Sequence, residues 1–541
     1  MIRPFRETIT QQEERAKVPF SARLLGFCKT LGRWLFLWVC SLATAWLVWQ
    51  SYPSISRNEL AWLSLAPFIW GITRTKGFWS SFFYSWVTAL LFNAGIFEWI
   101  YTTCFDGGGL SREMSLAAWW GLSGLMALPF ACFGASCFYL RKTHGFFPLL
   151  AACAFVSFEW LHQTIAFYGL GFPWVMLGYT QWNAPEMIQL AAYTGTYGIS
   201  FVIVFISASV GWAFADKGFK SGVSHMLLVT AVFVAVYFFG QYHLPSEKHK
   251  KFQPLLSLKT AIVQPNIDQY KKWTSEFEEE IAATLADMGK QMEQKNINLA
   301  VWPESSIPTS LEDEKYQTLF SDFVTNTGAS QVVGSNLTEG IKQYVVTAFI
   351  SPLEKPHFYR KQKLVPFGEY IPLESFLRSL FKDVAVLGAL GSFSAGEGEQ
   401  PLASVAGISF GQTICYESIY PQLWHKQNRQ GARFFVNVTN DAWFFDTAAP
   451  HQHLAVNVLR AVETGRPVLR AANTGFSAFI DPFGRIEQKT KLFVKDMLIT
   501  DVPLAVGENK NFYTQWGDWF AWLCATVFFS VFISLVVFSY E

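Results

Sequence analysis

Eight long apolar runs constrain this chain more than any other feature of its sequence. A helix needs about 20 apolar residues to cross the hydrocarbon core of a bilayer, and each run approaches or exceeds that length. The expected spans are 33–50, 58–73, 78–100, 116–140, 147–165, 186–214, 223–240 and 519–539. The sequence therefore predicts a polytopic α-helical membrane protein.

Composition supports a membrane location and argues against nucleic acid as a partner. Only 15% of the residues are charged, well below the ~25% of ordinary soluble proteins. The formal net charge of +1 provides no basic field that would attract nucleic acid. The 52 Phe and 22 Trp suit apolar spans with tryptophan anchors at the membrane interface. We therefore expect the lipid bilayer itself as a partner.

Lys and Arg in the short loops predict the orientation of these spans. The tail at 1–30 is basic, and so are the loops at 74–76, 141–142 and 217–220. The loop at 166–185 contains neither Lys nor Arg. Because cytoplasmic loops are enriched in Lys and Arg, this alternation places both termini in the cytoplasm. The polar stretch between the seventh and eighth spans is then extracytoplasmic.

Four segments follow from these spans. They are a cytoplasmic tail at 1–30, a membrane domain with spans one to seven at 31–240, an extracytoplasmic domain at 241–516 and a last span at 517–541. The outer domain alternates strand-like runs, such as 299–302 and 408–414, with helical stretches, such as 275–294. This alternation predicts α/β layers around one or two sheets, with chemistry at the strand ends.

Cys415 is the only cysteine in the polar stretch from 248 to 516. A disulfide framework needs pairs, so disulfides do not hold this domain together. Cys415 follows the apolar run at 408–414 and precedes Tyr416 and Glu417. This position is typical of a nucleophile on a sharp strand-to-helix turn, where a thiol is already a strong nucleophile. The alternative for a lone cysteine is a buried structural thiol.

Two other strand ends carry charged side chains. Glu304 follows an apolar run and Pro303, and a desolvated carboxyl group can accept and return a proton near neutrality. Lys361 and Lys363 lie on the same side of an extended segment, and a fixed ammonium can stabilise an oxyanion. Glu369 is placed to hold that ammonium. Taken alone, the Glu304 segment could equally hold a solvated loop glutamate, and two surface lysines before a turn would be the better interpretation of the lysine segment.

Three motifs resemble those of the nitrilase (carbon–nitrogen hydrolase) superfamily, in that superfamily's order. They are Trp-Pro-Glu at 302–304, Lys361 with Leu-Val-Pro-Phe-Gly-Glu-Tyr at 364–370, and Cys-Tyr-Glu at 415–417. With its spans, the chain resembles the apolipoprotein N-acyltransferase family along nearly its whole length. Further segments similar to that family are 171–174, 178–181, 263–267, 272–273, 440–444, 450–453, 463–467 and 516–519.

The resemblance implies an αββα sandwich on the periplasmic side of a bacterial cytoplasmic membrane and a ping-pong acyl transfer. Cys415 would take a fatty acyl group from a phospholipid as a thioester. The α-amino group of a diacylglyceryl-cysteine at an apolipoprotein N-terminus would then receive it. Glu304 would be the general base and then the acid, Lys361 the oxyanion stabiliser and Glu369 its support. Residues Tyr416 and Glu417 would help to hold the pocket.

The same resemblance implies roles at the entrance to the site. Trp273 and Trp443 would belong to mobile arms there, although a packed core is the commoner place for tryptophan. Phe445 stands where the family usually has Gly, and a Cβ restricts the backbone that Gly would leave free. Loop shape and substrate preference therefore stay open. We expect no metal, no cofactor and a monomer.

Two other functions fit parts of the sequence. A membrane-tethered amidase of the nitrilase type would resolve the thioester with water, but a tether needs one span rather than eight. A transport or scaffold protein with an inert nitrilase-like domain has no reason to keep Glu304, Lys361 and Cys415. Three histidines of the domain have no spacing that fits a cysteine-protease signature: His425, His451 and His453.

Overall fold

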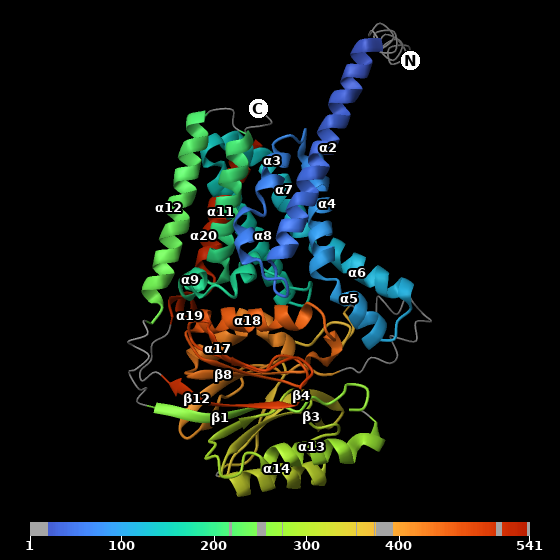
Figure 1. The fold of residues 1–541 in the computed structure, drawn as a ribbon, viewed down its shortest axis with the longest axis vertical. Coiled ribbons are helices and arrows are strands. Elements are labelled where there is room, and N and C mark those ends of the chain that lie inside the picture. Colours follow the sequence, from blue (N-terminus) through green and yellow to red (C-terminus); the bar gives the residue numbers. More distant parts are fainter. Residues whose placement is uncertain are drawn as a thin grey trace.

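In the computed structural model, a bundle of apolar helices stands on one end of a two-sheet α/β domain (Figure 1). The structure describes residues 20–215, 219–245, 256–272, 274–352, 354–372, 374, 393–504 and 511–537. The chain builds most of the bundle, then the α/β domain, and returns to the bundle with its last helix. The domain boundaries predicted near 30, 240 and 516 stay predictions, and most of the 1–30 tail lies outside the described residues.

The bundle consists of long apolar helices joined by short turns. They are α2 (Phe20–Ser51), α4 (Phe78–Ile96), α6 (Arg112–Met126), α7 (Leu128–Leu140), α8 (Phe147–Phe167), α11 (Thr196–Ala215), α12 (Phe219–His243) and α20 (Trp519–Val537). Among the described residues, five helical stretches are long and apolar enough to cross a membrane, or six if one bent pair counts as a span. The expected count of eight therefore stays a prediction.

Several of the expected spans are not continuous helices, and those at 58–73 and 186–214 contain short helical pieces. The short pieces found there are η1 (Asn58–Leu63), α3 (Ala66–Ile72), α9 (Pro185–Ile188) and α10 (Ala191–Thr194). Pro67 lies in the first turn of α3, and because proline lacks an N–H it suits the start of a helix. Gly195, with φ of +66°, separates α10 from α11. Hydropathy alone did not reveal these breaks.

The bent pair connects the bundle to the α/β domain. After α4 the chain turns by 55° into α5 (Trp99–Thr102) and the π-helix η2 (Thr103–Gly107). In Figure 1, α5 leans away from the bundle axis towards the side of the α/β domain. Segment η2 lies against the α/β-domain turn η8 (Asp441–Phe444).

The α/β domain contains two six-stranded sheets, ordered β12-β1-β2-β3-β4-β5 and β11-β10-β9-β8-β7-β6. In each sheet three neighbouring strands are parallel, β1 to β3 and β7 to β9, and the outer pairs are antiparallel. The strands are β1 (Leu256–Gln264), β2 (Leu299–Val301), β3 (Ser330–Glu339), β4 (Lys342–Ile350), β5 (His357–Arg360), β6 (Ala403–Val405), β7 (Ile408–Ile414), β8 (Phe434–Thr439), β9 (Val468–Ala472), β10 (Ala478–Ile480), β11 (Ile486–Lys489) and β12 (Asp496–Leu504).

Helices cover the outer face of each sheet, which gives four layers. Helices α13 (Glu278–Lys290) and α14 (Glu314–Thr327) cover the first sheet, and α17 (Pro421–Arg429) and α18 (Ala449–Thr464) lie between the second sheet and the bundle (Figure 1). Apolar side chains of the two inner faces form one buried core, with Ile262 and Val301 on one side and Phe410 and Val436 on the other. The observed order is αββα, as the resemblance implied.

Helix α18 joins the α/β domain to the bundle. Its Leu454, Val458 and Val462 are buried in the same apolar core as Ile203 and Ile206 of α11. Full burial of a large apolar side chain stabilises an interface by roughly 1.5–3 kcal/mol. The two halves of the protein therefore share a core, and the α/β domain is more than a tethered neighbour of the bundle.

Candidate active site

Three strand ends bring Glu304, Lys361 and Cys415 into one buried cluster. They follow β2, β5 and β7, respectively. The Nζ of Lys361 donates to Oε1 of Glu304 at 3.0 Å, and the Cys415 thiol interacts electrostatically with both side chains. Lys361 is fully buried, and Glu304 and Cys415 are at most 8% exposed. The cluster combines a thiol, a fixed cation and a carboxylate out of contact with bulk water.

Glu369 supplies a second carboxylate to the same ammonium. Its Oε1 accepts from Lys361 Nζ at 2.6 Å, and its Oε2 accepts from the N–H of Val365 at 2.9 Å. Burial alone would lower the pKa of Lys361, but Glu304 and Glu369 outweigh it and hold that pKa well above its ordinary value. Lys361 is therefore a cation that cannot release its proton near neutrality.

Cys415 occupies a sharp turn between β7 and the 3-10 helix η7 (Cys415–Ile419). Its φ of +50° lies in the left-handed region, which costs a non-glycine residue about 1–3 kcal/mol. Burial raises the pKa of its thiol and Glu304 raises it further, whereas Lys361 and the Thr439 hydroxyl lower it. The thiol is therefore protonated at neutral pH and needs a base, and the adjacent carboxylate of Glu304 is placed to take the proton.

Glu304 is held by backbone from both sheets. Its Oε2 accepts from the N–H of Asn440, which follows β8 in the second sheet. On its other side it lies against β3 at Gly334, where a Cβ would come within 2.3 Å of the Pro303 carbonyl oxygen. Only glycine permits this close approach of the two backbones. The Glu304 carboxylate is thus fixed by backbone contacts to both sheets.

Glu417 bridges the lysine segment and the cysteine turn. Its Oε1 accepts from the N–H of Gln362 at 2.5 Å and its Oε2 from the N–H of Ile414 at 2.8 Å and the hydroxyl of Tyr359 at 3.0 Å. Burial raises the pKa of Glu417 to about 7, although the backbone donors lower it. The resemblance implied only that Glu417 helps to hold the pocket, and the structure makes it the link between β5 and β7.

The remaining predicted residues lie towards the bundle. Tyr416 is buried, and its ring stacks on that of Phe172 at 5.6 Å. Trp443 is 42% exposed, and a Cβ on Gly107 of η2 would lie 3.4 Å from its ring. Trp273 lies outside the described residues.

Phe445 is the departure from the family pattern noted in the sequence. It adopts φ of 51° and ψ of −155°, a region that is essentially reserved for glycine. The backbone there keeps the shape that glycine would allow, so the phenylalanine is strained. Its ring reaches Gly107, because a Cβ on that glycine would lie 3.6 Å from it.

Sequence reasoning missed two sets of buried polar residues at this site. Lys272 is fully buried, and burial lowers its pKa to about 7, although Glu304 raises it. A charged group formed by Asp441, His453 and Arg470 lies behind Cys415. Asp441 and His453 stand in segments that carried the family resemblance, but their spacing gave no sign that they meet.

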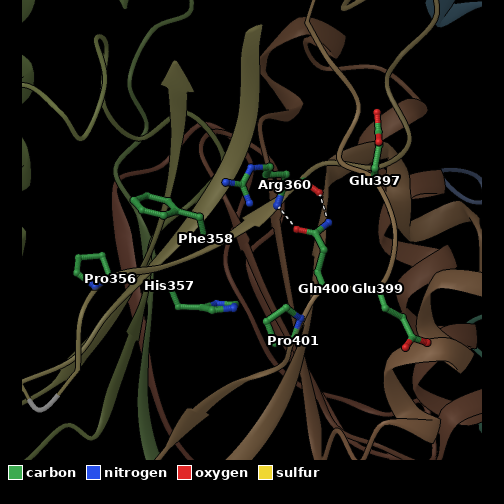
Figure 2. A pocket seen from close by; sticks show the side chains of 8 residues that line it. All are labelled: Pro356, His357, Phe358, Arg360, Glu397, Glu399, Gln400 and Pro401. Carbon is green, nitrogen blue, oxygen red and sulfur yellow. Dashed lines mark hydrogen bonds between the residues drawn. The ribbon is translucent and has the colours of Figure 1, made fainter. Parts of the chain in front are cut away.

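The pocket in Figure 2, of about 400 Å³, lies beside β5, and Glu304, Lys361 and Cys415 are not among the residues that line it. It is lined in part by Arg360, whose backbone N–H and C=O both bond to the side chain of Gln400. Since neighbouring residues of an extended chain point to opposite sides, Arg360 faces this pocket while Lys361 faces the cluster. Within the described ranges, no three His, Cys, Asp or Glu side chains are grouped to hold a metal ion.

Two family profiles match the chain in succession. The profile described as apolipoprotein N-acyltransferase N-terminal domain matches residues 44–209. The profile described as carbon-nitrogen hydrolase matches residues 259–510, which contain both sheets. The α/β domain therefore has the carbon–nitrogen hydrolase fold.

Whole-length relatives agree with the profiles. An apolipoprotein N-acyltransferase of Geobacter metallireducens is 34% identical over 88% of this chain and 90% of its own length. Another, of Agrobacterium fabrum, is 35% identical over 80% of this chain and 82% of its own length. Among solved structures, a CN-hydrolase superfamily protein of Xanthomonas campestris is 15% identical, covers 46% of this chain and 91% of its own, and gives a TM-score of 0.36.

Proposed function

The chain belongs to the apolipoprotein N-acyltransferase family, and from that premise we propose how it acts. It transfers a fatty acyl group from a phospholipid, through a thioester on Cys415, to the α-amino group of an N-terminal diacylglyceryl-cysteine of an apolipoprotein. The observation that carries this proposal is the buried cluster in which Lys361 lies 3.0 Å from Glu304, beside the thiol.

In the first half of the reaction, the sulfur of Cys415 attacks the ester carbonyl of the phospholipid. Glu304 takes the thiol proton as the C–S bond forms, and the ammonium of Lys361 stabilises the oxyanion. Collapse of this intermediate breaks the ester C–O bond. The leaving alkoxide of the lysophospholipid takes the proton back from Glu304, so the acyl-enzyme is left with its base ready for the second half.

In the second half, the neutral α-amino group of the apolipoprotein attacks the thioester carbonyl. Glu304 accepts a proton from the nitrogen, and Lys361 again stabilises the oxyanion. Collapse breaks the C–S bond, and the departing thiolate of Cys415 takes the proton from Glu304. The products are an amide on the apolipoprotein and the regenerated thiol, which is a ping-pong sequence.

We also propose a bacterial cytoplasmic membrane location, with eight spans, both termini in the cytoplasm and the α/β domain in the periplasm. The structure supports this orientation, because Arg141 donates to the carbonyl of Thr75 and so brings the two basic loops at 74–76 and 141–142 together. In Figure 1, α2 begins at the end of the bundle away from the sheets. Basic loops favour the cytoplasmic side. We propose that the protein acts as a monomer.

The test is a transfer assay with both substrates. Purified protein is incubated with a phospholipid and a synthetic peptide that begins with diacylglyceryl-cysteine, and the peptide is weighed by mass spectrometry. We expect the peptide to gain one acyl chain on its α-amino group, with one lysophospholipid released per transfer, and Cys415→Ala to show neither. Release of the acyl chain only as free fatty acid would instead identify a hydrolase, in which water resolves the thioester.

A further inference from the structure

A second buried polar cluster lies behind the nucleophile, outside the Glu304–Lys361–Cys415 group. It consists of Asp441, His453 of α18 and Arg470 of β9, all at most 1% exposed. Burying charged side chains is costly unless each is paired and hydrogen-bonded. Apolar residues would fill the same space without the desolvation free energy of buried charges. We therefore expect the cluster to hold neighbouring groups in position rather than to stabilise the fold.

Asp441 is the centre of this cluster. Its Oδ2 accepts from Arg470 at 2.7 Å, and its Oδ1 lies 2.9 Å from Nδ1 of His453. A further hydrogen bond at 2.6 Å joins Arg470 to Asn437 on β8. The carboxylate is therefore fixed between a strand of the second sheet and the helix that contacts the bundle, and it orients the imidazole ring.

The other ring nitrogen of His453 reaches the nucleophile's own turn. Nε2 lies 3.1 Å from the backbone oxygen of Cys415 and 2.9 Å from the hydroxyl of Ser418, also in η7. Because the Asp441 carboxylate only accepts, Nδ1 carries the ring proton, and the bare Nε2 of the neutral ring accepts from the Ser418 hydroxyl. A protonated ring would also donate from Nε2 to the Cys415 carbonyl. Either protonation state holds the turn that keeps Cys415 in its strained left-handed conformation.

The same cluster is joined to the base through one peptide unit. The residue before Asp441 is Asn440, whose N–H donates to Oε2 of Glu304 at 2.9 Å. Movement of Asp441 would thus displace the carboxylate that comes from the first sheet. Since Cys415 belongs to the second sheet, the contacts of residues 440–441 and His453 fix the distance between nucleophile and base across the two sheets.

We propose that His453 is a positioning residue that, through Asp441 and its neighbour Asn440, holds Cys415 in register with Glu304. Its role is to keep the thiol within reach of the carboxylate, and it does not touch the reacting atoms. A shift of 1 Å between two reacting groups can reduce a rate by about 10²-fold. The inference rests on the proposed function only where acyl transfer is the readout.

Two isosteric variants separate the two sides of the ring. The amide nitrogen of Asn stands where Nδ1 was, and that of Gln stands where Nε2 was. We expect His453→Gln to keep the link to the Cys415 turn and to retain acylation by phospholipid within about threefold of wild type. We expect His453→Asn to lose the link and to form the acyl-enzyme about 10²-fold more slowly, with an unchanged KM for phospholipid.

The neighbouring histidine of the same helix provides a matched control. His451 packs against the ring of Phe476, whose backbone oxygen accepts from Arg470, so it lies near the cluster. Its contacts differ from those of His453 to Asp441 and the Cys415 turn. We therefore expect His451→Asn to form the acyl-enzyme at the wild-type rate. The melting temperatures of all three variants are measured as well. A variant that is slow only because it is less stable should show a lower melting temperature together with its lower acylation rate.

A second readout does not depend on acyl transfer. The rate at which iodoacetamide alkylates Cys415 is followed by site-resolved mass spectrometry, with and without Glu304→Gln. Because residues in contact through a network are energetically coupled, we expect Glu304→Gln to slow alkylation about tenfold in wild type and in His453→Gln, and less than about twofold in His453→Asn.

These two readouts distinguish the failures. If no variant, nor wild type, transfers acyl chains but the alkylation coupling behaves as expected, the proposed function is wrong and the positioning role stands. If Glu304→Gln slows alkylation equally in all backgrounds, the positioning role is wrong. Equal losses of acylation in His453→Asn and His453→Gln, matched by equal falls in melting temperature, would also overturn it, since the cluster would then only hold the fold.

Discussion

The two sides of Cys415 differ in kind. On one side lie the charged groups of the α/β domain, with Lys361 held between the carboxylates of Glu304 and Glu369. On the other side lie aromatic rings. Tyr416, next to Cys415 in the chain, is one of them, and the bundle contributes several others. Under the proposed reaction, the difference teaches that the reacting groups belong to the α/β domain, whereas part of the aromatic cover that excludes water belongs to the bundle.

The aromatic side is a continuous stack that crosses between the halves. The ring of Tyr416 lies on Phe172, and Phe172 lies on Trp174 at 5.6 Å with nearly parallel planes. The indole nitrogens of Trp99 and Trp174 both donate to one oxygen of Gln452 on α18. Such a surface is largely apolar, so it excludes water and suits an acyl chain.

The largest expected effect breaks the charged side. Lys361→Met removes the cation that faces the oxyanion, and we expect acyl transfer to fall by about 10³-fold with little change in KM. Lys363→Met is the matched control, because its ammonium bonds instead to the carbonyl of Phe167 at the end of α8. We expect that control to lose less than about tenfold. Equal losses of acyl transfer in both variants would show that Lys361 does not act as the specific oxyanion stabiliser.

A smaller effect is expected where the charged side is braced. In Glu417→Gln an amide NH₂ replaces one oxygen and faces an N–H donor from Ile414 or Gln362. One unsatisfied buried donor costs about 1–3 kcal/mol, so both the melting temperature and kcat should fall. Tyr359→Phe removes only one hydroxyl donor to Glu417 and should lower both by less. The comparison is checked by thermal unfolding and steady-state kinetics of the two variants.

The aromatic side should respond in a different parameter. Trp174→Phe keeps the ring on Phe172 but removes the N–H donor to Gln452, at a cost of about 0.5–1.5 kcal/mol. We expect KM for the phospholipid to rise severalfold while kcat stays within about twofold. A kcat effect as large as that of Lys361→Met would contradict the division between the two sides.

The smallest effect on the reaction rate concerns a buried amine on the charged side, which acts on stability and depends on pH. Burial lowers the pKa of Lys272 from 10.5 to about 7 in the folded protein. Between pH 7 and 10.5 the unfolded chain therefore binds more protons at this site than the folded one, and stability rises with pH across that window. The contribution is lost as pH falls through 7.

The corresponding variant is Lys272→Met, which removes the buried charge. Its melting temperature should exceed that of wild type by the largest margin below pH 7, and the margin should shrink as pH approaches 10.5. The measurement is the melting temperature of Lys272→Met minus that of wild type, taken at pH 6 and at pH 10. An equal margin at both pH values would mean that this amine does not titrate in the window.

The strand ends of the site could be predicted from the sequence for a physical reason. The apolar run of a buried strand ends where the chain leaves the core. Glu304, Lys361 and Cys415 each follow such a run, and this position made them candidates. The motif order then indicated the family, which the comparisons confirm. That these residues carry the reaction stays a prediction.

The contacts between elements could not be predicted in the same way. The role of Glu417 depends on Gln362, 55 residues earlier, and that of His453 on a turn 38 residues earlier. No local period encodes such pairings. Helix breaks such as the one at Gly195 were also missed, because hydropathy reports what is apolar and not where a backbone turns.

The thioester on Cys415 is the central claim and can be measured directly. The protein is incubated with a phospholipid that carries an isotopically labelled acyl chain, then digested, and its peptides are analysed by mass spectrometry. We predict a mass increase equal to that acyl chain on the peptide containing Cys415, removed by neutral hydroxylamine and absent in Cys415→Ser. An adduct on another residue, or transfer to the lipopeptide by a protein that never carries label on Cys415, would contradict the claim.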